Sequence, residues 1–213
     1  MTFRSPARAT AVTALGVGAL TLLGFGTATA APETATWADN GTVYNRTISN
    51  TTPSAGDTIT VSTKLERTNA TDEQINWLKD WHPACLTYVV DSAKIIDSAG
   101  THAVEPYLEL NPEFIAGDFT ATSYKVIIKE HFGDVQPATF SAQYKVGADC
   151  AKGVALTTGI EYLSNLGHHA DFKTRGPAIT VGGVPGGGTG GTGSAGSPLG
   201  ALGSLLGGFG SSK

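Results

Sequence analysis

A histidine and a cysteine lie three residues apart in the segment KDWHPACLTYV, and this pair could do three kinds of chemistry. His82 could activate the Cys85 thiol, both side chains could bind a metal ion, or Cys85 could form a disulfide. Pro83 stiffens the backbone between them, so the two side chains need not meet. The chain has one further cysteine, Cys150, and an even count is typical of a disulfide in an exported protein. We therefore predict a Cys85–Cys150 bridge, with a reactive Cys–His pair as the alternative.

Among the other histidines and carboxylates, two groups could bind a metal ion. His168-His169, with Asp171, follows a glycine in a predicted loop, and Glu130-His131 is the next group. Adjacent residues of an extended chain point in opposite directions, so His168 and His169 make a poor chelate unless the loop turns. The sequence has no CxxC, HExxH or EF-hand spacing and no G-x-S-x-G motif. We therefore predict no catalytic residue, no metal site and no cofactor.

Two tryptophans and a tyrosine lie close to the first cysteine, at positions 77, 81 and 88. Trp77 shares strand parity with Ile75, which predicts that its side chain lies in the core. Trp81 stands beside a loop, and we expect it to pack in the core or over the disulfide. Stacking of Trp81 on a sugar or on a side chain of a partner is the alternative.

The first thirty residues have the composition of a bacterial secretory signal. Two arginines precede an apolar run over residues 9–26, and Ala28-Thr29-Ala30 supplies the small residues of a cleavage site. We predict cleavage between Ala30 and Ala31. A membrane-spanning helix needs ~20 apolar residues, and glycine, threonine and alanine dilute this run, so we predict no integral membrane anchor in the mature chain. The mature protein would then be secreted or loosely associated with the cell envelope.

The charge balance argues against two classes of partner. The whole chain carries 14 basic and 18 acidic residues, and the signal contains two of the basic residues and none of the acidic ones. The mature chain therefore has 12 basic and 18 acidic residues, a net charge of −6. Nucleic acids and anionic membrane surfaces attract basic surfaces, so neither is an expected partner.

Composition divides the mature chain into a domain and a tail. Residues 31–181 have a mixed, globular composition, and their length suits one domain. Residues 182–213 contain half of the 28 glycines of the chain and few large side chains, so they offer little burial to offset the entropy of ordering. We predict a flexible tail over residues 182–213; weak adhesion of its leucines to the envelope is the alternative.

The domain shows the period-two alternation of strands that have one buried face. In residues 58–68, Ile59, Val61 and Leu65 alternate with polar residues, and residues 137–146 and 123–129 repeat this pattern. Turn residues separate the runs. Further strands are expected at residues 42–49, 74–80, 86–90, 104–110, 153–162 and 178–181. About eight or nine short strands predict an all-β, two-sheet antiparallel sandwich.

Several motifs recur in the order found in a known family: Gly56-Asp57-Thr58, an alternating strand, Asn69, a second strand, Pro83, Leu86-Thr87-Tyr88-Val89 and Ser92-Ala93. With them, this part of the chain resembles the conserved-repeat domain of bacterial surface proteins, the family called domain of unknown function eleven. The resemblance implies an immunoglobulin-like sandwich that spaces, displays or binds molecules outside the cell, without a general catalytic site. The chain departs from the family pattern in having one copy, two cysteines and a Gly-rich end.

The cysteine pair also differs from that of immunoglobulin domains, in which a core tryptophan lies between the two cysteines. Trp77 and Trp81 both precede Cys85, so we expect the bridge to join loops or strand ends. Closing a loop of about 65 residues would remove roughly 4 kcal/mol of unfolded-chain entropy.

The sequence as a whole predicts a protein that is not an enzyme. It would be a secreted module of the envelope or the extracellular space that acts in binding, adhesion or spacing, with an envelope or extracellular protein or glycan as its partner. The alternative is an exported hydrolase of envelope glycan or lipid that uses His168, His169 and Asp171. A third possibility is a sandwich with a small-ligand pocket between its sheets.

Overall fold

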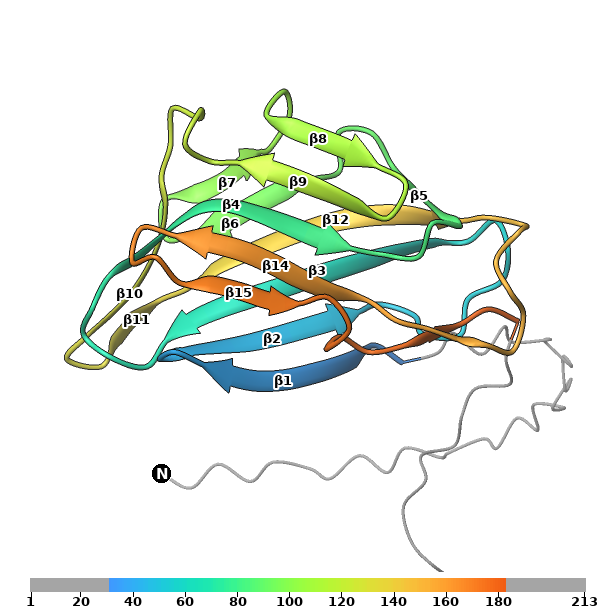
Figure 1. The fold of residues 1–213 in the computed structure, drawn as a ribbon, viewed down its shortest axis with the longest axis horizontal. Coiled ribbons are helices and arrows are strands. Elements are labelled where there is room, and N and C mark those ends of the chain that lie inside the picture. Colours follow the sequence, from blue (N-terminus) through green and yellow to red (C-terminus); the bar gives the residue numbers. More distant parts are fainter. Residues whose placement is uncertain (1–30, 183–213) are drawn as a thin grey trace, which may run out of the picture.

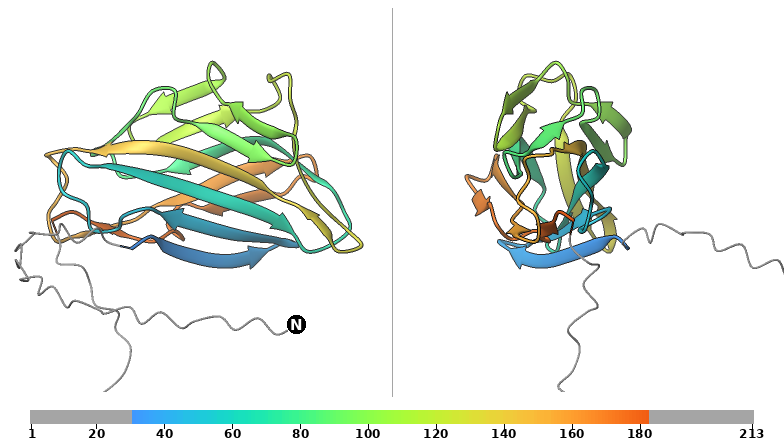
Figure 2. Two further views of the ribbon diagram at one scale, coloured as in Figure 1. Left: turned by 180° about the vertical axis from the view of Figure 1, so that it is seen from behind. Right: turned by 90° about the vertical axis from the view of Figure 1, so that its right-hand side faces the viewer.

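The computed structural model describes residues 31–182, and the predicted signal, its cleavage bond and most of the predicted tail lie outside this range. Within it, sixteen strands and no helix are found, so no helix there could span a membrane. Two sheets pack face to face, as Figure 1 and the rear view in Figure 2 show. The prediction of an all-β, two-sheet antiparallel sandwich is confirmed.

The first sheet contains the longest uninterrupted ladder of the fold, between β3 and β12. The strand order is β1-β2-β3-β12-β6-β7, and β5 also pairs with β12. The strands are β1 (Glu33–Asp39), β2 (Thr42–Ile48), β3 (Thr58–Arg67), β5 (Leu86–Tyr88), β6 (Lys94–Asp97), β7 (Gly100–Ala103) and β12 (Ala138–Val146).

The second sheet is organised around β4, which lies in the front layer of Figure 1. The order is β11-β10-β4-β14-β15, and β9 pairs with β4 and with β8. The strands are β4 (Glu73–Trp81), β8 (Leu108–Asn111), β9 (Phe114–Asp118), β10 (Val126–His131), β11 (Asp134–Gln136), β14 (Gly159–Ser164) and β15 (His169–Phe172). A short third ladder joins β13 (Ala155–Leu156) to β16 (Ile179–Thr180).

The core lies between the two sheets and follows the predicted alternation. On β3, Ile59, Val61 and Leu65 are buried, and the alternate residues of β12 from Ala138 to Val146 are buried as well. Because every second side chain of a strand points to the same face, these two paired strands line one wall of the core. The opposite wall includes Ile75, Leu78, Val126, Ile128, Ile160 and Tyr162.

Some predicted strands differ from the observed ones. The run predicted at residues 104–110 is a turn in its first part, and β8 begins at Leu108, because Pro106 has no N–H to donate to a ladder. The run predicted at residues 153–162 is broken into β13 and β14. The prediction also missed β1, β6, β7, β9, β11 and β15.

The predicted disulfide is present. Cys85 and Cys150 are bonded, with their Cα atoms 5.1 Å apart. Cys85 lies just before β5 and Cys150 lies beyond the end of β12, so the bridge joins strand ends, as expected. Because β5 pairs with the end of β12, the bridge fastens a short outer strand to the central ladder of the first sheet.

Candidate functional site

His82 does not activate a thiol, because Cys85 is bonded to Cys150. The His82 side chain is buried with its ring centroid 4.6 Å from that of Tyr144, and its Nδ1 lies 3.0 Å from the carbonyl oxygen of Pro83. Burial lowers the pKa of His82 below that of an exposed histidine. The ring is therefore neutral at physiological pH and is part of the packed interior.

A buried ion pair joins the two sheets behind β4. Arg46 on β2 contacts Asp80 on β4, with Nη1 2.5 Å from Oδ1, and both side chains are 1% exposed. The hydroxyl of Tyr144, on β12, also donates to Asp80. Burial and the negative charge of Asp80 raise the pKa of Tyr144 well above its usual value, so this hydroxyl stays protonated. The group is a closed set of interactions that fixes β4 against the first sheet.

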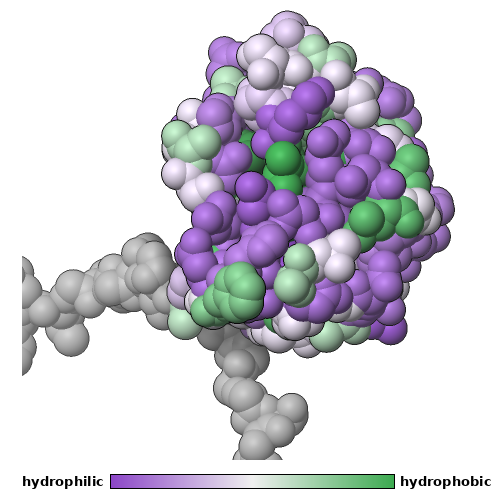
Figure 3. Space-filling view, turned by 90° about the vertical axis from the view of Figure 1, so that its left-hand side faces the viewer, coloured by the Kyte–Doolittle hydropathy of each residue, from purple (hydrophilic) through white to green (hydrophobic). Residues whose placement is uncertain are grey.

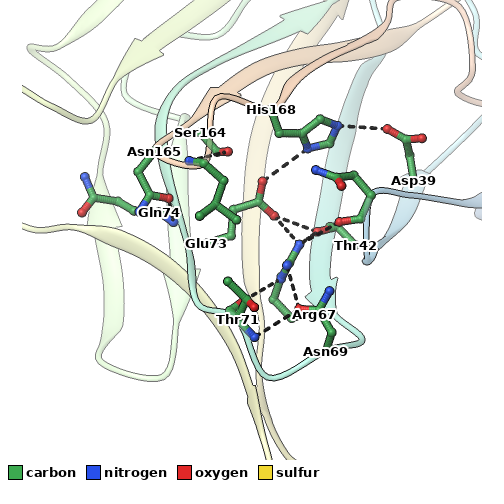
Figure 4. Close-up of polar contacts among 12 residues, drawn as sticks. Asp39, Thr42, Arg67, Asn69, Thr71, Glu73, Gln74, Ser164, Asn165 and His168 are labelled. Atoms are coloured by element: carbon green, nitrogen blue, oxygen red, sulfur yellow. Dashed lines mark hydrogen bonds and ion pairs between the residues drawn. The ribbon is translucent and has the colours of Figure 1, made fainter.

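A second buried ion pair lies at the start of β4, shown in Figure 4. Glu73 is fully buried, and its Oε2 accepts hydrogen bonds from Arg67 Nη1 and Thr42 Oγ1, each at 2.8 Å. Its Oε1 lies 3.3 Å from Nδ1 of His168. The Nε2 of the same ring is 2.9 Å from Asp39 Oδ2. The ends of β1 and β3, the starts of β2 and β4, and the turn before β15 are therefore held together at this end of the sandwich (Figure 4).

The cluster that motivated the hydrolase alternative does not come together. His168 points inward to Glu73, whereas His169 points outward, where its Nε2 lies 2.9 Å from Glu161 Oε1. Asp171 is on the outer surface and pairs with Lys173 at 3.3 Å. Among residues 31–182, no group of three or more His, Cys, Asp or Glu side chains is placed to hold a metal ion. His168 and His169 diverge as the extended backbone dictates.

The two tryptophans of β4 lie on the outer face of the second sheet, which corrects the prediction that Trp77 is in the core. Trp77 is half-buried, although Ile75 is fully buried. The reason is an irregularity in the ladder: Ser164 pairs with Ile75 and Leu163 pairs with Trp77, so Asn76 is an extra residue on β4. Such a bulge reverses the parity of the residues that follow it. Trp81 is outside for the same reason and not in the core.

The register places the outward side chains of this face in three cross-strand rows. The first row contains Asp118, Trp77, Leu163 and His169; the second contains Glu109, Ala116, Lys79, Glu161 and Asp171; the third contains Asn111, Phe114, Trp81 and Gly159. We call this surface, formed by the outward residues of β8, β9, β4, β14 and β15, the aromatic face.

Aromatic and charged groups alternate across the aromatic face. The rings of Trp81 and Phe114 are 5.0 Å apart, and the Nζ of Lys79 is 4.7 Å from the Phe114 ring and 5.4 Å from that of Trp77. The Nζ of Lys173 is 5.0 Å from the Trp81 ring. Glu161 completes the set, with Oε2 3.1 Å from Trp81 Nε1. Each aromatic ring thus has a charged neighbour.

Two hollows open along the aromatic face. One, of about 360 Å³, is lined by Trp77, Lys79, Tyr107, Glu109, Ala116, Gly117 and Asp118. The other, of about 460 Å³, lies near the end of β4 and is lined by residues 81–84, 113, 155–157 and 173–174, which include Trp81 and Lys173. His82 also lines the second hollow, and its Nε2 has no hydrogen-bond partner among the described residues.

The other surfaces differ from this face. The outward residues of β3 and β12 are Thr60, Ser62, Lys64, Glu66, Thr139, Ser141, Gln143 and Lys145, none of them aromatic. Figure 3 looks onto the end of the sandwich at the left of Figure 1, where hydrophilic groups predominate and the hydrophobic areas are small and separate. The aromatic face is therefore the surface with the most distinctive chemistry among those described.

Sequence reasoning singled out Trp77 and Trp81 but not the residues that accompany them. Phe114 and Asp118 belong to β9, which was not predicted, and Tyr107 lies in the turn before β8, where a strand was predicted. The sequence of β9, Phe-Ile-Ala-Gly-Asp, has no apolar–polar alternation, and its three central residues are all buried, so no periodic signal marked this strand.

Comparisons with known proteins give remote likenesses. No family model matches the chain, and no curated protein matches it. The solved structures include the pilus backbone protein RrgB of Streptococcus pneumoniae, with 9% identity, a TM-score of 0.37 and coverage of 53% of this chain and 26% of that one. The major pilin BcpA of Bacillus cereus has 8% identity, a TM-score of 0.40 and coverage of 70% and 39%.

A collagen-binding domain of a Staphylococcus aureus adhesin has 11% identity and a TM-score of 0.31, with coverage of 72% of this chain and 96% of that one. The chain spans less than two fifths of the length of the two pilin chains named above. All three TM-scores are below 0.5, too low to assign a family or a partner. The chain is thus an all-β sandwich with remote likeness to domains of bacterial pilins and surface adhesins.

Proposed function

We propose that the protein is a noncatalytic module of the cell envelope or the extracellular space, which binds an envelope component through the aromatic face. The observation that carries this proposal is the division of polar groups between two environments. Arg46, Asp80, Arg67 and Glu73 are buried and satisfied by one another and by neighbouring hydroxyls, so they support the fold. The tryptophans of β4, in contrast, are held partly in solvent by a rigid strand.

The position of the aromatic face on a central strand supports a binding role. β4 pairs with β10, β9 and β14, and two buried ion pairs anchor its two halves to the first sheet. Side chains on such a strand are held in fixed positions, which lowers the entropic cost of binding. Tryptophan and tyrosine are also the residues that contribute most at binding surfaces, because they combine a large apolar area with a polar group.

The geometry does not favour the hydrolase alternative. Its three residues point to two sides of the sheet, and His168 is occupied by the buried carboxylate of Glu73 and the half-exposed carboxylate of Asp39. A general acid or base must come within hydrogen-bond reach of the bond that reacts. His169 and Asp171 remain on the aromatic face, where His169 contacts Glu161 and Asp171 contacts Lys173.

The export and domain predictions belong to the same proposal. Residues 1–30 would be removed between Ala30 and Ala31, residues 31–181 would form the module, and residues 182–213 would be a linker or a weak adhesive segment. Expression in a secreting bacterium, followed by N-terminal sequencing of the protein outside the cells, should give a chain that begins at Ala31. Retention of residues 1–30 in the exported protein would contradict this assignment.

Binding can be tested by cosedimentation of the chain from Ala31 to Lys213 with washed bacterial envelopes. The double variant Trp77→Ala/Trp81→Ala should lower the bound fraction at least tenfold. The matched control is Lys64→Ala/Lys145→Ala, which changes two outward residues of the first sheet. Equal binding of the unmodified chain and the tryptophan variant would contradict the proposal, and so would the absence of any binding to envelopes.

A further inference from the structure

The aromatic face offers groups of both charges around apolar rings, and this mixture restricts the ligand. The first hollow holds two carboxylates, Glu109 and Asp118, and one ammonium group, that of Lys79, beside the rings of Trp77 and Tyr107. A hydrogen bond from the Thr120 side chain lowers the pKa of Asp118, so this group is a carboxylate at neutral pH.

Three ligand classes fit this hollow poorly. An anionic ligand would meet two carboxylates, and a strongly cationic one would meet Lys79. A wholly apolar ligand would take three charged groups out of water without giving them partners. The remaining class is uncharged and carries both apolar faces and many hydroxyl or amide groups, which donate to carboxylates and accept from an ammonium group.

Saccharides have this chemistry, because the C–H faces of a pyranose ring are apolar and its hydroxyls lie around the rim. The aromatic rings of Trp77 and Tyr107 can cover such a face, while Glu109, Asp118 and Lys79 reach the rim. Lys79 now lies near the ring of Trp77, but a cation–π contact at the protein surface is weak, so a ligand can displace it.

The two hollows together indicate a chain of sugars. Trp77 and Trp81 point to the same side of β4 and are four residues apart, which corresponds to about 13 Å at the rise of a β-strand. Trp77 lines the first hollow and Trp81 the second. Because this span exceeds one pyranose ring, a single sugar could occupy only one of the two hollows.

The balance of charge also selects among polysaccharides. Over the aromatic face and the second hollow together, the carboxylates of Glu109, Glu113, Asp118, Glu161 and Asp171 outnumber the ammonium groups of Lys79 and Lys173. Uronate or phosphate-bearing polymers would therefore be repelled. We propose that the aromatic face binds a neutral or N-acetylated glycan chain, with sugar rings on Trp77 and Trp81; this inference rests on the proposed binding function.

The test measures binding of defined polymers to the chain from Ala31 to Lys213. Neutral probes are soluble β-linked and α-linked glucans and oligomers of N-acetylglucosamine; charged probes are polygalacturonate and a polylysine peptide. Affinity electrophoresis and calorimetry should detect at least one neutral glycan, and a pentasaccharide should bind at least tenfold more tightly than the disaccharide of the same series. Polygalacturonate and polylysine should bind at least tenfold more weakly.

Variants locate the binding. Trp77→Ala and Trp81→Ala should each weaken glycan binding at least tenfold, and Glu109→Ala, which alters an exposed side chain in the first hollow, should weaken it about threefold without affecting the fold. Phe132→Ala is the matched control, because Phe132 is an exposed aromatic residue away from the face. Its binding should equal that of the unmodified chain.

The outcomes separate this inference from the proposed function. If envelopes bind through the two tryptophans but no neutral glycan does, or if polylysine or polygalacturonate binds better, the saccharide inference is wrong and the binding function stands. Unchanged glycan affinity in both tryptophan variants and in Glu109→Ala also overturns the inference. If neither envelopes nor any probe binds, both proposals are wrong.

Discussion

Replacement of Asp80 by asparagine should strongly destabilise the sandwich. Asp80 and Arg46 are each 1% exposed, and Asp80 also accepts a hydrogen bond from Tyr144. The other contacts of the Arg46 guanidinium are neutral oxygens of Thr63, Thr158 and Trp81. In Asp80→Asn the guanidinium therefore keeps its charge in the interior but loses its carboxylate partner.

The expected cost follows from this burial. Removal of one partner from a buried ion pair costs about 3–5 kcal/mol, since the other charge stays uncompensated. A domain of this size has a total stability of roughly 5–15 kcal/mol, so the loss is a large part of it. For a domain of about 150 residues, the melting temperature should fall by roughly 6–20 °C.

Urea unfolding followed by tryptophan fluorescence measures this effect, with the disulfide intact. The midpoint should move to lower urea while the slope is unchanged, which indicates a change in stability and not in the unfolded state. Lys64→Gln is the control, because it removes an ion pair in which the side chains are 44% and 27% exposed and should cost at most about 1 kcal/mol.

A double variant shows whether the lost stability comes from the uncompensated charge or from poorer packing. Arg46→Met/Asp80→Leu removes both charges and keeps an apolar filling, so it should recover most of the stability lost in Asp80→Asn. The reasoning would be refuted by a cost below about 1 kcal/mol for Asp80→Asn, or by a double variant less stable than the single one.

Three further outcomes are expected. Because burial lowers the pKa of His82, its contribution to stability is complete above pH ~6.5 and is lost as pH falls from there. In urea titrations from pH 7.5 to 4.5, the free energy of unfolding of His82→Gln should therefore fall less than that of the unmodified chain. An equal fall in both proteins would contradict this. Replacement of Cys85 and Cys150 by alanine should lower the free energy of unfolding by roughly 4 kcal/mol, and calorimetry showing under 1 kcal/mol would count against it. Phe132 has a φ of 54° in a turn before Gly133, a conformation that asparagine adopts more readily than phenylalanine. Phe132→Asn should therefore raise the free energy of unfolding measured in urea by about 0.5–1 kcal/mol, and a decrease would contradict this.

The strands that the sequence predicts well are those with long, regular alternation. β3 and β12 have ten and nine residues, and their buried positions follow the period of two without interruption. Short strands such as β6, β7 and β11 have too few residues for such a pattern to stand out. β1 was missed although Asn40-Gly41, the two-residue sequence most typical of a hairpin turn, precedes β2 directly.

The buried charges show a different limit. Arg46 has the same parity on β2 as Tyr44 and Ile48, and Glu73 has the same parity on β4 as Ile75. Both positions could therefore have been assigned to the interior from parity alone. What the sequence does not reveal is the partner across the sandwich, since Arg46 meets Asp80 and Glu73 meets Arg67 only once the sheets are stacked. Compensation of a buried charge is thus a property of the packed layers and not of a single strand.

The extra residue Asn76 links the fold to the proposed site. It lies where β4 changes its partner from β10, which pairs up to Ile75, to β9, which pairs from Trp77 onward. If β4 ran through Asn76 as a regular strand without the bulge, the parity of Ile75 would carry both tryptophans into the core and turn Asp80 outward, away from Arg46. One bulge therefore places the tryptophans on the surface and completes the ion pair that anchors the strand carrying them.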